Sequence, residues 1–248
     1  MKHLYSKKVI KKSTCKNEGD IEYTCDRCLY SYDKKVDALG HTYKQTVTPA
    51  AIGKDGKFVK KCSACGATVT SAIAKISSVN LSTVNYTYNG RVKTPSVIVK
   101  DSKGKALKNG TDYKISYPKG MKNVGKYTVK VTLKGNYSGS KSMTYNINPK
   151  GTGVSKVTAA KKGFKVTWKK QATQTTGYQV QYSTSSKFKS AKTVTISKNK
   201  TTSKSVSKLS AKKKYYVRVR TYKTVKIGGK SVKLYSGWSK AKSVTTKK

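Results

Sequence analysis

Residues 214–222 show the clearest alternation of apolar and polar side chains in the chain. Tyr215 and Val217 fall on one face of an extended segment, and Arg218 and Arg220 fall on the other. A period of two is typical of a β-strand that buries one face and leaves the other in water. The pattern therefore predicts a strand here, with a core on its tyrosine and valine side.

The same alternation recurs through the last third of the chain. It predicts strands at residues 163–168 and 177–182 and a final run at 236–246. Leu209 precedes Tyr215 by six residues, which suits a loop residue packed under a corner tyrosine of a Greek-key sandwich. These spaced motifs resemble strands B, C, F and G of a fibronectin type III domain over residues 150–248. The resemblance implies a β-sandwich that spaces or binds, and it does not name a ligand.

Residues 74–149 hold a second group of short alternating segments. They predict strands at residues 86–90, 96–100, 112–117, 125–133 and 143–147, with a hairpin turn at 134–139. Four motifs stand among them: Tyr-Asn-Gly at 88–90, Asp-Tyr at 112–113, Asn-Val-Gly-Lys-Tyr at 123–127 and Gly-Asn-Tyr-Ser-Gly at 135–139. They resemble the bacterial immunoglobulin-like modules of surface proteins, which implies a second β-sandwich.

Residues 1–73 contain two copies of a Cys-x-x-Cys unit, 37–38 residues apart. The matched positions are His3 and His41, Cys15 and Ile52, Cys25 and Cys62, and Cys28 and Cys65. Each unit is predicted to be a hairpin that turns at a glycine and carries the cysteine pair in a second tight turn. The units resemble small zinc-ribbon-like repeats found near surface modules of Gram-positive bacterial proteins. The expected architecture is thus all-β, with Cys/His hairpin repeats followed by an immunoglobulin-like and a fibronectin type III sandwich.

The cysteines and histidines of these repeats predict a structural zinc site. Three thiolates and one imidazole form a closed tetrahedral site, and Cys15, Cys25 and Cys28 with His41 would supply it, His3 being an alternative fourth ligand. In so small a segment the metal would contribute most of the folding free energy. A catalytic zinc would need an open position and a nearby general base, and the repeat offers neither.

Two other interpretations of the cysteines stay open. Cys25 and Cys28 could join Cys62 and Cys65 in a four-cysteine site. Outside the cell, pairs of cysteines could instead oxidise to disulfides, although five cysteines cannot all pair within one chain.

Charge changes the expectation about partners. The chain has 55 Lys and Arg against 9 Asp and Glu, and no acidic residue follows Asp112. Only four of the basic residues are Arg, the side chain that forks onto phosphates and guanine edges. A lysine-coated surface with diffuse affinity for polyanions is therefore expected, such as anionic cell-wall polymers, with nucleic acid bound non-specifically at most. Protein or glycan ligands stay open.

Several catalytic constellations are missing from the sequence. Both histidines lie in the Cys repeats, so no Ser-His-Asp or Cys-His-Asn set can form elsewhere. Residues 113–248 contain no side-chain carboxylate, which removes paired-acid glycosidase chemistry from that half. No glycine-rich phosphate loop follows a strand. The chain is therefore predicted not to be an enzyme.

The start of the chain bears on its origin. No apolar stretch is long enough for a membrane span, and no apolar segment of a signal peptide follows Met1. Residues 3–5 match residues 41–43, which close the first Cys unit, so the chain is interpreted as a truncated piece of an exported protein.

The resemblances and the residues together predict a non-enzymatic region of a bacterial surface or wall-associated protein, outside the cell. It would act as a spacer, an adhesion element or a tether to anionic wall polymers. The alternative is an accessory binding region of a cell-wall enzyme whose catalytic domain lies outside this chain.

Overall fold

The computed structural model describes residues 2–248 and is all-β, which confirms the predicted fold class. Among the described residues there are 20 strands and no helix. The chain divides into two compact units. The first comprises the chain up to Ser78 with Val99–Tyr113 and Leu133–Gly139, and the second comprises Val79–Ile98, Lys114–Thr132 and Ser140–Lys248.

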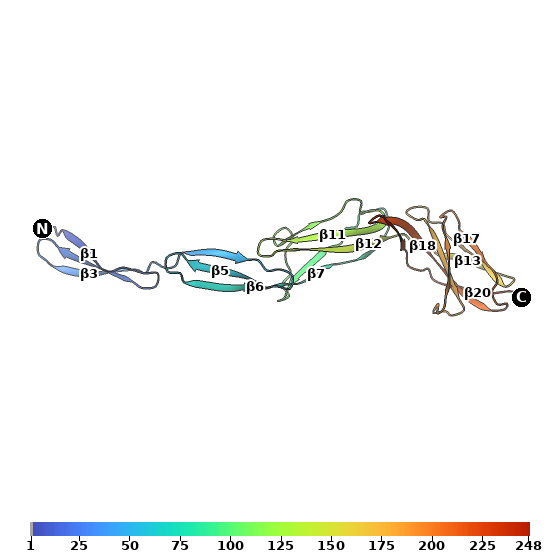
Figure 1. The fold of residues 1–248 in the computed structure, drawn as a ribbon, viewed down its shortest axis with the longest axis horizontal. Helices are drawn as coiled ribbons and strands as arrows, with labels where there is room; N and C mark the ends of the chain where they lie inside the picture. Colours follow the sequence, from blue (N-terminus) through green and yellow to red (C-terminus); the bar gives the residue numbers. More distant parts are fainter. Residues whose placement is uncertain (1) are drawn as a thin grey trace. The chain divides into compact units, whose positions relative to one another are not determined.

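Each Cys repeat forms a three-stranded antiparallel sheet in which the strands follow one another in chain order (Figure 1). The strands of the first are β1 (Tyr5–Lys11), β2 (Gly19–Cys25) and β3 (Ser31–Val36), and those of the second are β4 (Tyr43–Thr48), β5 (Gly56–Cys62) and β6 (Thr68–Ile73). The predicted hairpin is present in both, with the cysteine pair in the second turn. The structure adds a third strand to each.

Glycine is required where the middle strand of each sheet begins. A Cβ on Gly19 would lie 2.5 Å from the backbone nitrogen of Ser13, and one on Gly56 would lie 2.4 Å from that of Ala50. Both distances are far inside van der Waals contact. The first turn of each repeat can therefore close tightly only because no side chain stands there.

These two sheets bury little apolar surface. Every residue of β4 is exposed, and β6 buries only Ile73. In the first repeat, the ring of Tyr32 stacks on that of Tyr23 at 5.2 Å and meets that of Tyr5 edge-on at 5.4 Å. Sheets of this size without a core need another source of stability.

The predicted strands of residues 74–149 are all present. β7 (Ile76–Leu81) pairs with β9 (Val97–Asp101), while a second sheet has the order β10-β11-β12-β8. The bounds of its strands are Tyr113–Ser116 for β10, Gly125–Leu133 for β11, Ser140–Asn148 for β12 and Asn85–Thr87 for β8. In the second unit, Val129, Tyr145 and Ile147 form a core against which residues of both sheets pack, among them Leu81 and Val97.

Two sheets make up the last third of the chain. One has the order β13-β14-β17, with bounds Val154–Ala160, Gly163–Trp168 and Ser203–Val206. The other has the order β16-β15-β18-β19, and β20 also pairs with β18. Its strands are β16 (Lys192–Ile196), β15 (Gly177–Ser183), β18 (Lys214–Ile227), β19 (Lys230–Tyr235) and β20 (Lys242–Thr245).

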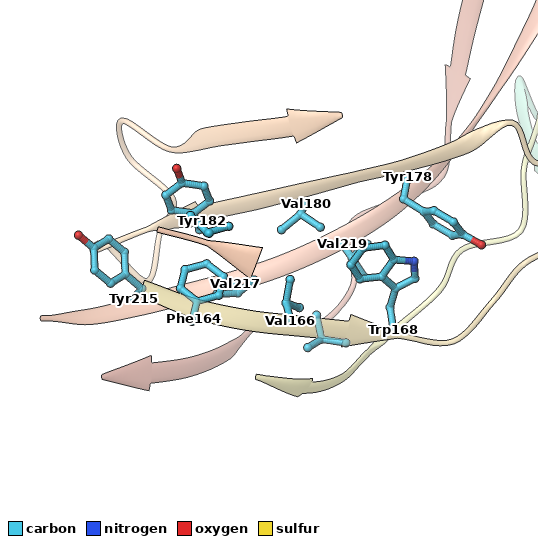
Figure 2. Close-up of a cluster of buried hydrophobic side chains, with 11 residues drawn as sticks. Phe164, Val166, Trp168, Tyr178, Val180, Tyr182, Tyr215, Val217 and Val219 are labelled. Atoms are coloured by element: carbon cyan, nitrogen blue, oxygen red, sulfur yellow. The ribbon is translucent and has the colours of Figure 1, made fainter. Parts of the chain in front are cut away.

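The core between these sheets is built from the predicted alternating positions (Figure 2). Three side chains of β14 point toward the facing strands β15 and β18: Phe164, Val166 and Trp168. The facing residues are Tyr178, Val180 and Tyr182 of β15 and Val217 and Val219 of β18. All are less than a tenth exposed, so burial of one strand face is confirmed.

Two strands differ in length from the prediction. β18 extends to Ile227, because Gly228 and Gly229 at φ +55° and +79° make the two-residue turn into β19. The final run is a strand only at Lys242–Thr245. Before it, the hydroxyls of Ser236 and Ser239 accept hydrogen bonds from the backbone N–H groups of β18, where another strand would otherwise pair.

The corner tyrosine also differs. Leu209 packs against the core as expected, but its own N–H makes the backbone link, to Lys162 O at 2.9 Å. The Tyr215 hydroxyl points away from the core (Figure 2). The predicted tyrosine corner at Tyr215 is therefore wrong, and it is Tyr178 of β15 whose hydroxyl bonds to loop backbone, donating to Asn199 O and accepting from Gln171 N–H, both at 2.9 Å.

Candidate metal centres and cationic surface

Strand register places a histidine beside each Cys-x-x-Cys turn. Tyr5 pairs with Cys25 and Tyr43 pairs with Cys62, so the residue two positions before each tyrosine lies next to the cysteine that ends the middle strand. These residues are His3 and His41. The partner histidine of each cysteine pair therefore comes before the pair in the sequence.

The two Cys-x-x-Cys turns have the same backbone. Leu29 N–H donates to Cys25 O at 2.9 Å, and Gly66 N–H donates to Cys62 O at 3.0 Å. Leu29 and Gly66 both have positive φ, +58° and +73°. A left-handed residue after the second cysteine closes each turn, and both sulfurs of the pair lie within 4.8 Å of the same histidine nitrogen.

Hydrogen bonds favour the thiolate form at the first cysteine of each pair. The side chain of His3, then backbone N–H groups of the turn, lower the pKa of the Cys25 thiol to about 6. The backbone N–H of Cys65, then the side chain of His41, lower the pKa of Cys62 to about 6 as well.

Four potential ligands come together at the second repeat: Cys15, His41, Cys62 and Cys65, with all ligand atoms within 4.8 Å of one another. The Sγ atoms of Cys15 and Cys62 are 3.8 Å apart, and Cys65 Sγ lies 3.3 Å from His41 Nδ1. Cys62 is buried, Cys15 and His41 are half-buried, and Cys65 is exposed. The group thus has one closed side and one side near the surface.

Three potential ligands come together at the first repeat. His3 Nδ1 lies 3.4 Å from Cys25 Sγ and 3.6 Å from Cys28 Sγ. Cys25 is buried, whereas the other two are exposed. Among the described residues this group has no fourth ligand within 4.8 Å.

The structure divides the predicted ligands differently from the sequence prediction. Cys15 does not lie with Cys25 and Cys28, because it occupies the first turn of its repeat while they occupy the second. The strand between the turns, Gly19–Cys25, makes six residue steps, or about 20 Å at about 3.3 Å per residue. His41 joins Cys15 but not the first cysteine pair, and the two cysteine pairs do not form one group.

The distances in both groups fit zinc. Zn–S bonds of about 2.3 Å and Zn–N bonds of about 2.0–2.1 Å at tetrahedral angles put two sulfurs about 3.8 Å apart and a sulfur and a nitrogen about 3.6 Å apart. The observed separations are 3.8 Å for the sulfur pair and 3.3–3.6 Å for the sulfur–nitrogen pairs. None of the five cysteines forms a disulfide.

Residues 150–248 present an unbalanced cationic surface. They contain 25 lysines and two arginines, with no Asp or Glu. Every lysine is exposed except Lys223, which is half-buried. No carboxylate side chain of this stretch can neutralise these charges, and the ammonium groups stay accessible to anions in solution.

The two arginines of this stretch form a ladder with aromatic rings on the outer face of the sheet. Arg220 lies over Tyr235 at 3.9 Å and over Trp238 at 4.2 Å, and Arg218 lies over Phe188 at 3.8 Å. Gln179 and Gln181 on β15 accept hydrogen bonds from Arg220 and Arg218, respectively. Burial lowers the pKa of both guanidinium groups.

The alternation of side chains in residues 214–222 predicts that Arg218 and Arg220 lie on the solvent-facing side of a strand. The alternation does not by itself predict the ladder, but the sequence contains a signal for it. The Arg-x-Arg of β18 pairs in register with the Gln-x-Gln of β15. The guanidinium groups are held by rings and amides, so they are less free to meet a ligand than the lysines.

Arg220→Lys should destabilise this domain by about 1–3 kcal/mol, because lysine keeps the charge but loses the planar stacking and the paired hydrogen bonds to Gln179. Thermal unfolding of the full chain measures this. Lys204→Arg at an exposed position is the matched control and should have no effect. Equal stabilities for the two variants would mean that the ladder contributes nothing.

No described segment forms a helix of the length and apolar content that a membrane crossing needs.

Comparison with known proteins gives one family match. The family model described as "Fibronectin type III domain" matches residues 147–236. Among solved structures, the chain is similar to "Crystal structure of chicken CNTN1 FN1-FN3 domains", with 12% identity, 100% of each chain covered and a TM-score of 0.36. It is also similar to "Crystal structure of domains A168-A170 from titin", with 13% identity, 99% of each chain covered and a TM-score of 0.29. No curated protein matches the chain.

Proposed function

We propose that this chain, which carries a fibronectin type III domain at residues 147–236, is a non-enzymatic modular region of an exported bacterial surface or wall-associated protein. Its β-modules space or present another part of the protein. Its lysine-rich C-terminal domain holds anionic wall polymers, such as teichoic acids or acidic polysaccharides, as a non-covalent tether.

The observation that carries this proposal is the exposure of the lysines over residues 150–248 in the absence of any side-chain carboxylate. Uncompensated like charges repel one another and destabilise the compact state. A flexible polyanion relieves this repulsion and releases its own counterions, so its binding is favourable without a shaped pocket.

The chemistry of the cations indicates weak selectivity. Lysine is a strongly hydrated point charge that does not impose bidentate geometry on a phosphate. The arginines that could do so are occupied by the ladder on β18. Charge density should therefore decide which polymers bind, and DNA or heparin should compete with wall polymers in solution.

Binding of the full chain to purified Gram-positive cell walls should fall steeply with salt. Between about 50 and 500 mM salt the Debye length shrinks from about 14 Å to about 4 Å, so lysine–polyanion attraction is largely screened. The measurement is sedimentation of the chain with walls, before and after chemical removal of their anionic polymers. Removal should abolish binding at low salt.

A charge variant provides the matched control. Lys212, Lys213 and Lys214 are consecutive and exposed, and changing all three to Gln should make the negative slope of log affinity against log salt shallower by as much as about 2–3. Changing all three to Arg keeps the charge and should leave the slope unchanged. Affinity that persists at high salt, or on stripped walls, would indicate a shaped site for a neutral glycan or protein and would contradict the tether.

A further inference from the structure

The structure assigns a zinc site that joins the two Cys repeats: we propose that Cys15 of the first repeat and His41, Cys62 and Cys65 of the second bind one Zn²⁺ between them. This inference does not depend on the proposed function. It concerns the first compact unit, and the lysine-rich domain plays no part in it.

The ligand set has the composition and the geometry of a closed structural zinc site. Three thiols and one imidazole lie within 4.8 Å of one another, at separations that match tetrahedral coordination. The turns that carry the three cysteines are closed by backbone hydrogen bonds. Thr14 N–H donates to Asn17 O at 2.9 Å around Cys15, and Gly66 N–H closes the turn of the cysteine pair.

A backbone hydrogen bond holds the two repeats together beside the four ligands. Leu39 N–H donates to Thr14 O at 2.9 Å, so the segment that leads to His41 runs beside the turn that carries Cys15. The lead cysteine of one repeat is thereby presented to the histidine and cysteine pair of the next. The first repeat thus supplies its lead cysteine to the ligands of the repeat that follows it.

Ile52 supports this arrangement from within the sequence. It is the counterpart of Cys15, and the turn that carries it is closed in the same way, by Ala51 N–H donating to Lys54 O at 2.9 Å. His41 and Cys62 follow Cys15 by 26 and 47 residues, and the positions that follow Ile52 by the same intervals are Ser78 and Val99. Neither Ser78 nor Val99 is a usual zinc ligand, so a cysteine at position 52 would have no histidine or cysteine pair to share a metal with. Ile52 instead forms an isolated β-bridge with Ile76.

The site explains how two sheets without a core are held. β4 is exposed throughout and β3 buries no residue fully. Apolar burial therefore contributes little to the stability of either repeat or to the joint, meaning the place where the Cys15 turn of the first repeat meets the second repeat. A zinc ion bound by both repeats supplies folding free energy and ties the turn of one to the strand ends of the other. The joint would loosen when the metal is removed.

The three-ligand group at His3, Cys25 and Cys28 should bind zinc more weakly. It leaves one coordination position to water, and two of its three ligands are exposed. A competing chelator of intermediate strength should therefore remove this metal first. One tightly held zinc per chain is the expected content of the wild-type protein.

Three serine variants of the full chain test the assignment against its two rivals. The protein is purified under reducing conditions and titrated with Zn²⁺ against a competing chelator. Cys15→Ser and Cys62→Ser should each lower the affinity of the tight site at least about 100-fold, beyond the loss of an outer-shell partner, while Cys25→Ser should leave it unchanged. Loss in Cys15→Ser and Cys25→Ser alone would indicate the first-repeat site, and loss in Cys25→Ser and Cys62→Ser alone would indicate the four-cysteine site. Either result overturns the proposal.

Two further measurements guard against a variant that merely misfolds. Co²⁺ bound at the tight site of the wild-type chain should show thiolate charge-transfer absorbance of three sulfurs. Ile52→Cys should add no second tight zinc, because no ligands await it. The proposed zinc site would be contradicted by a Co²⁺ spectrum of four thiolates, by a tight second zinc in Ile52→Cys, or by a wild-type chain that binds no zinc.

Discussion

Trp168→Ala is expected to lower the free energy of unfolding of the fibronectin type III domain by about 3–5 kcal/mol, the usual cost of emptying a core aromatic site. Trp168 is 3% exposed and packs against Tyr178 with ring centroids 5.3 Å apart. Small domains have only about 5–15 kcal/mol of stability in total, so this loss removes a large share of it. Denaturant unfolding followed by circular dichroism measures the change.

Trp168→Phe is the control for this experiment. The indole Nε1 is buried without a hydrogen-bond partner, so phenylalanine keeps much of the packing and removes no hydrogen bond. A cost clearly smaller than that of alanine is expected, about 1–2 kcal/mol. If alanine itself cost less than about 1 kcal/mol, the side chain would not be part of the core.

Gly177→Ala is the second large expected loss, about 1–3 kcal/mol or more, because overpacking forces the backbone to move. A Cβ at this position would lie 2.0 Å from Ile196 O, across the pair formed by β15 and β16. The contact is with backbone, which cannot rotate away as a flexible side chain can. β16 would have to separate from β15 at its end, and amide hydrogen exchange of residues 192–196 should accelerate.

Gly237→Ala serves as the matched glycine control. A Cβ there meets nothing within 4 Å, and the residue lacks the positive φ that favours glycine. Its stability should change by no more than about 0.5 kcal/mol, as at other surface sites. A loss as large in Gly237→Ala as in Gly177→Ala would mean that the close approach at Ile196 O is not responsible.

The sequence alone determined most of the strands and the side of each that is buried. Burial alternates with the pleat of the backbone, so a period of two in the side chains is a local record of the sheet face. This is why the strands at 163–168 and 177–182 and the core role of Trp168 could be predicted. A cluster of Cys and His side chains could be expected as well, because ligand chemistry depends on residue type, while the binding of zinc there stays a prediction.

Only the tertiary structure decided which ligands share a group and what holds the arginines. Cys15 is ten residues from Cys25 in the sequence but stands at the opposite end of a strand, while Cys62, 47 residues away, lies 3.8 Å from it. Sequence separation is a poor measure of distance when extended strands carry the chain about 3.3 Å per residue and turns bring it back. In the same way, Arg220 meets Tyr235 and Trp238 through pairing of β18 with β19 and through the loop that follows it. Such meetings depend on long-range pairing, which no local pattern of side chains records.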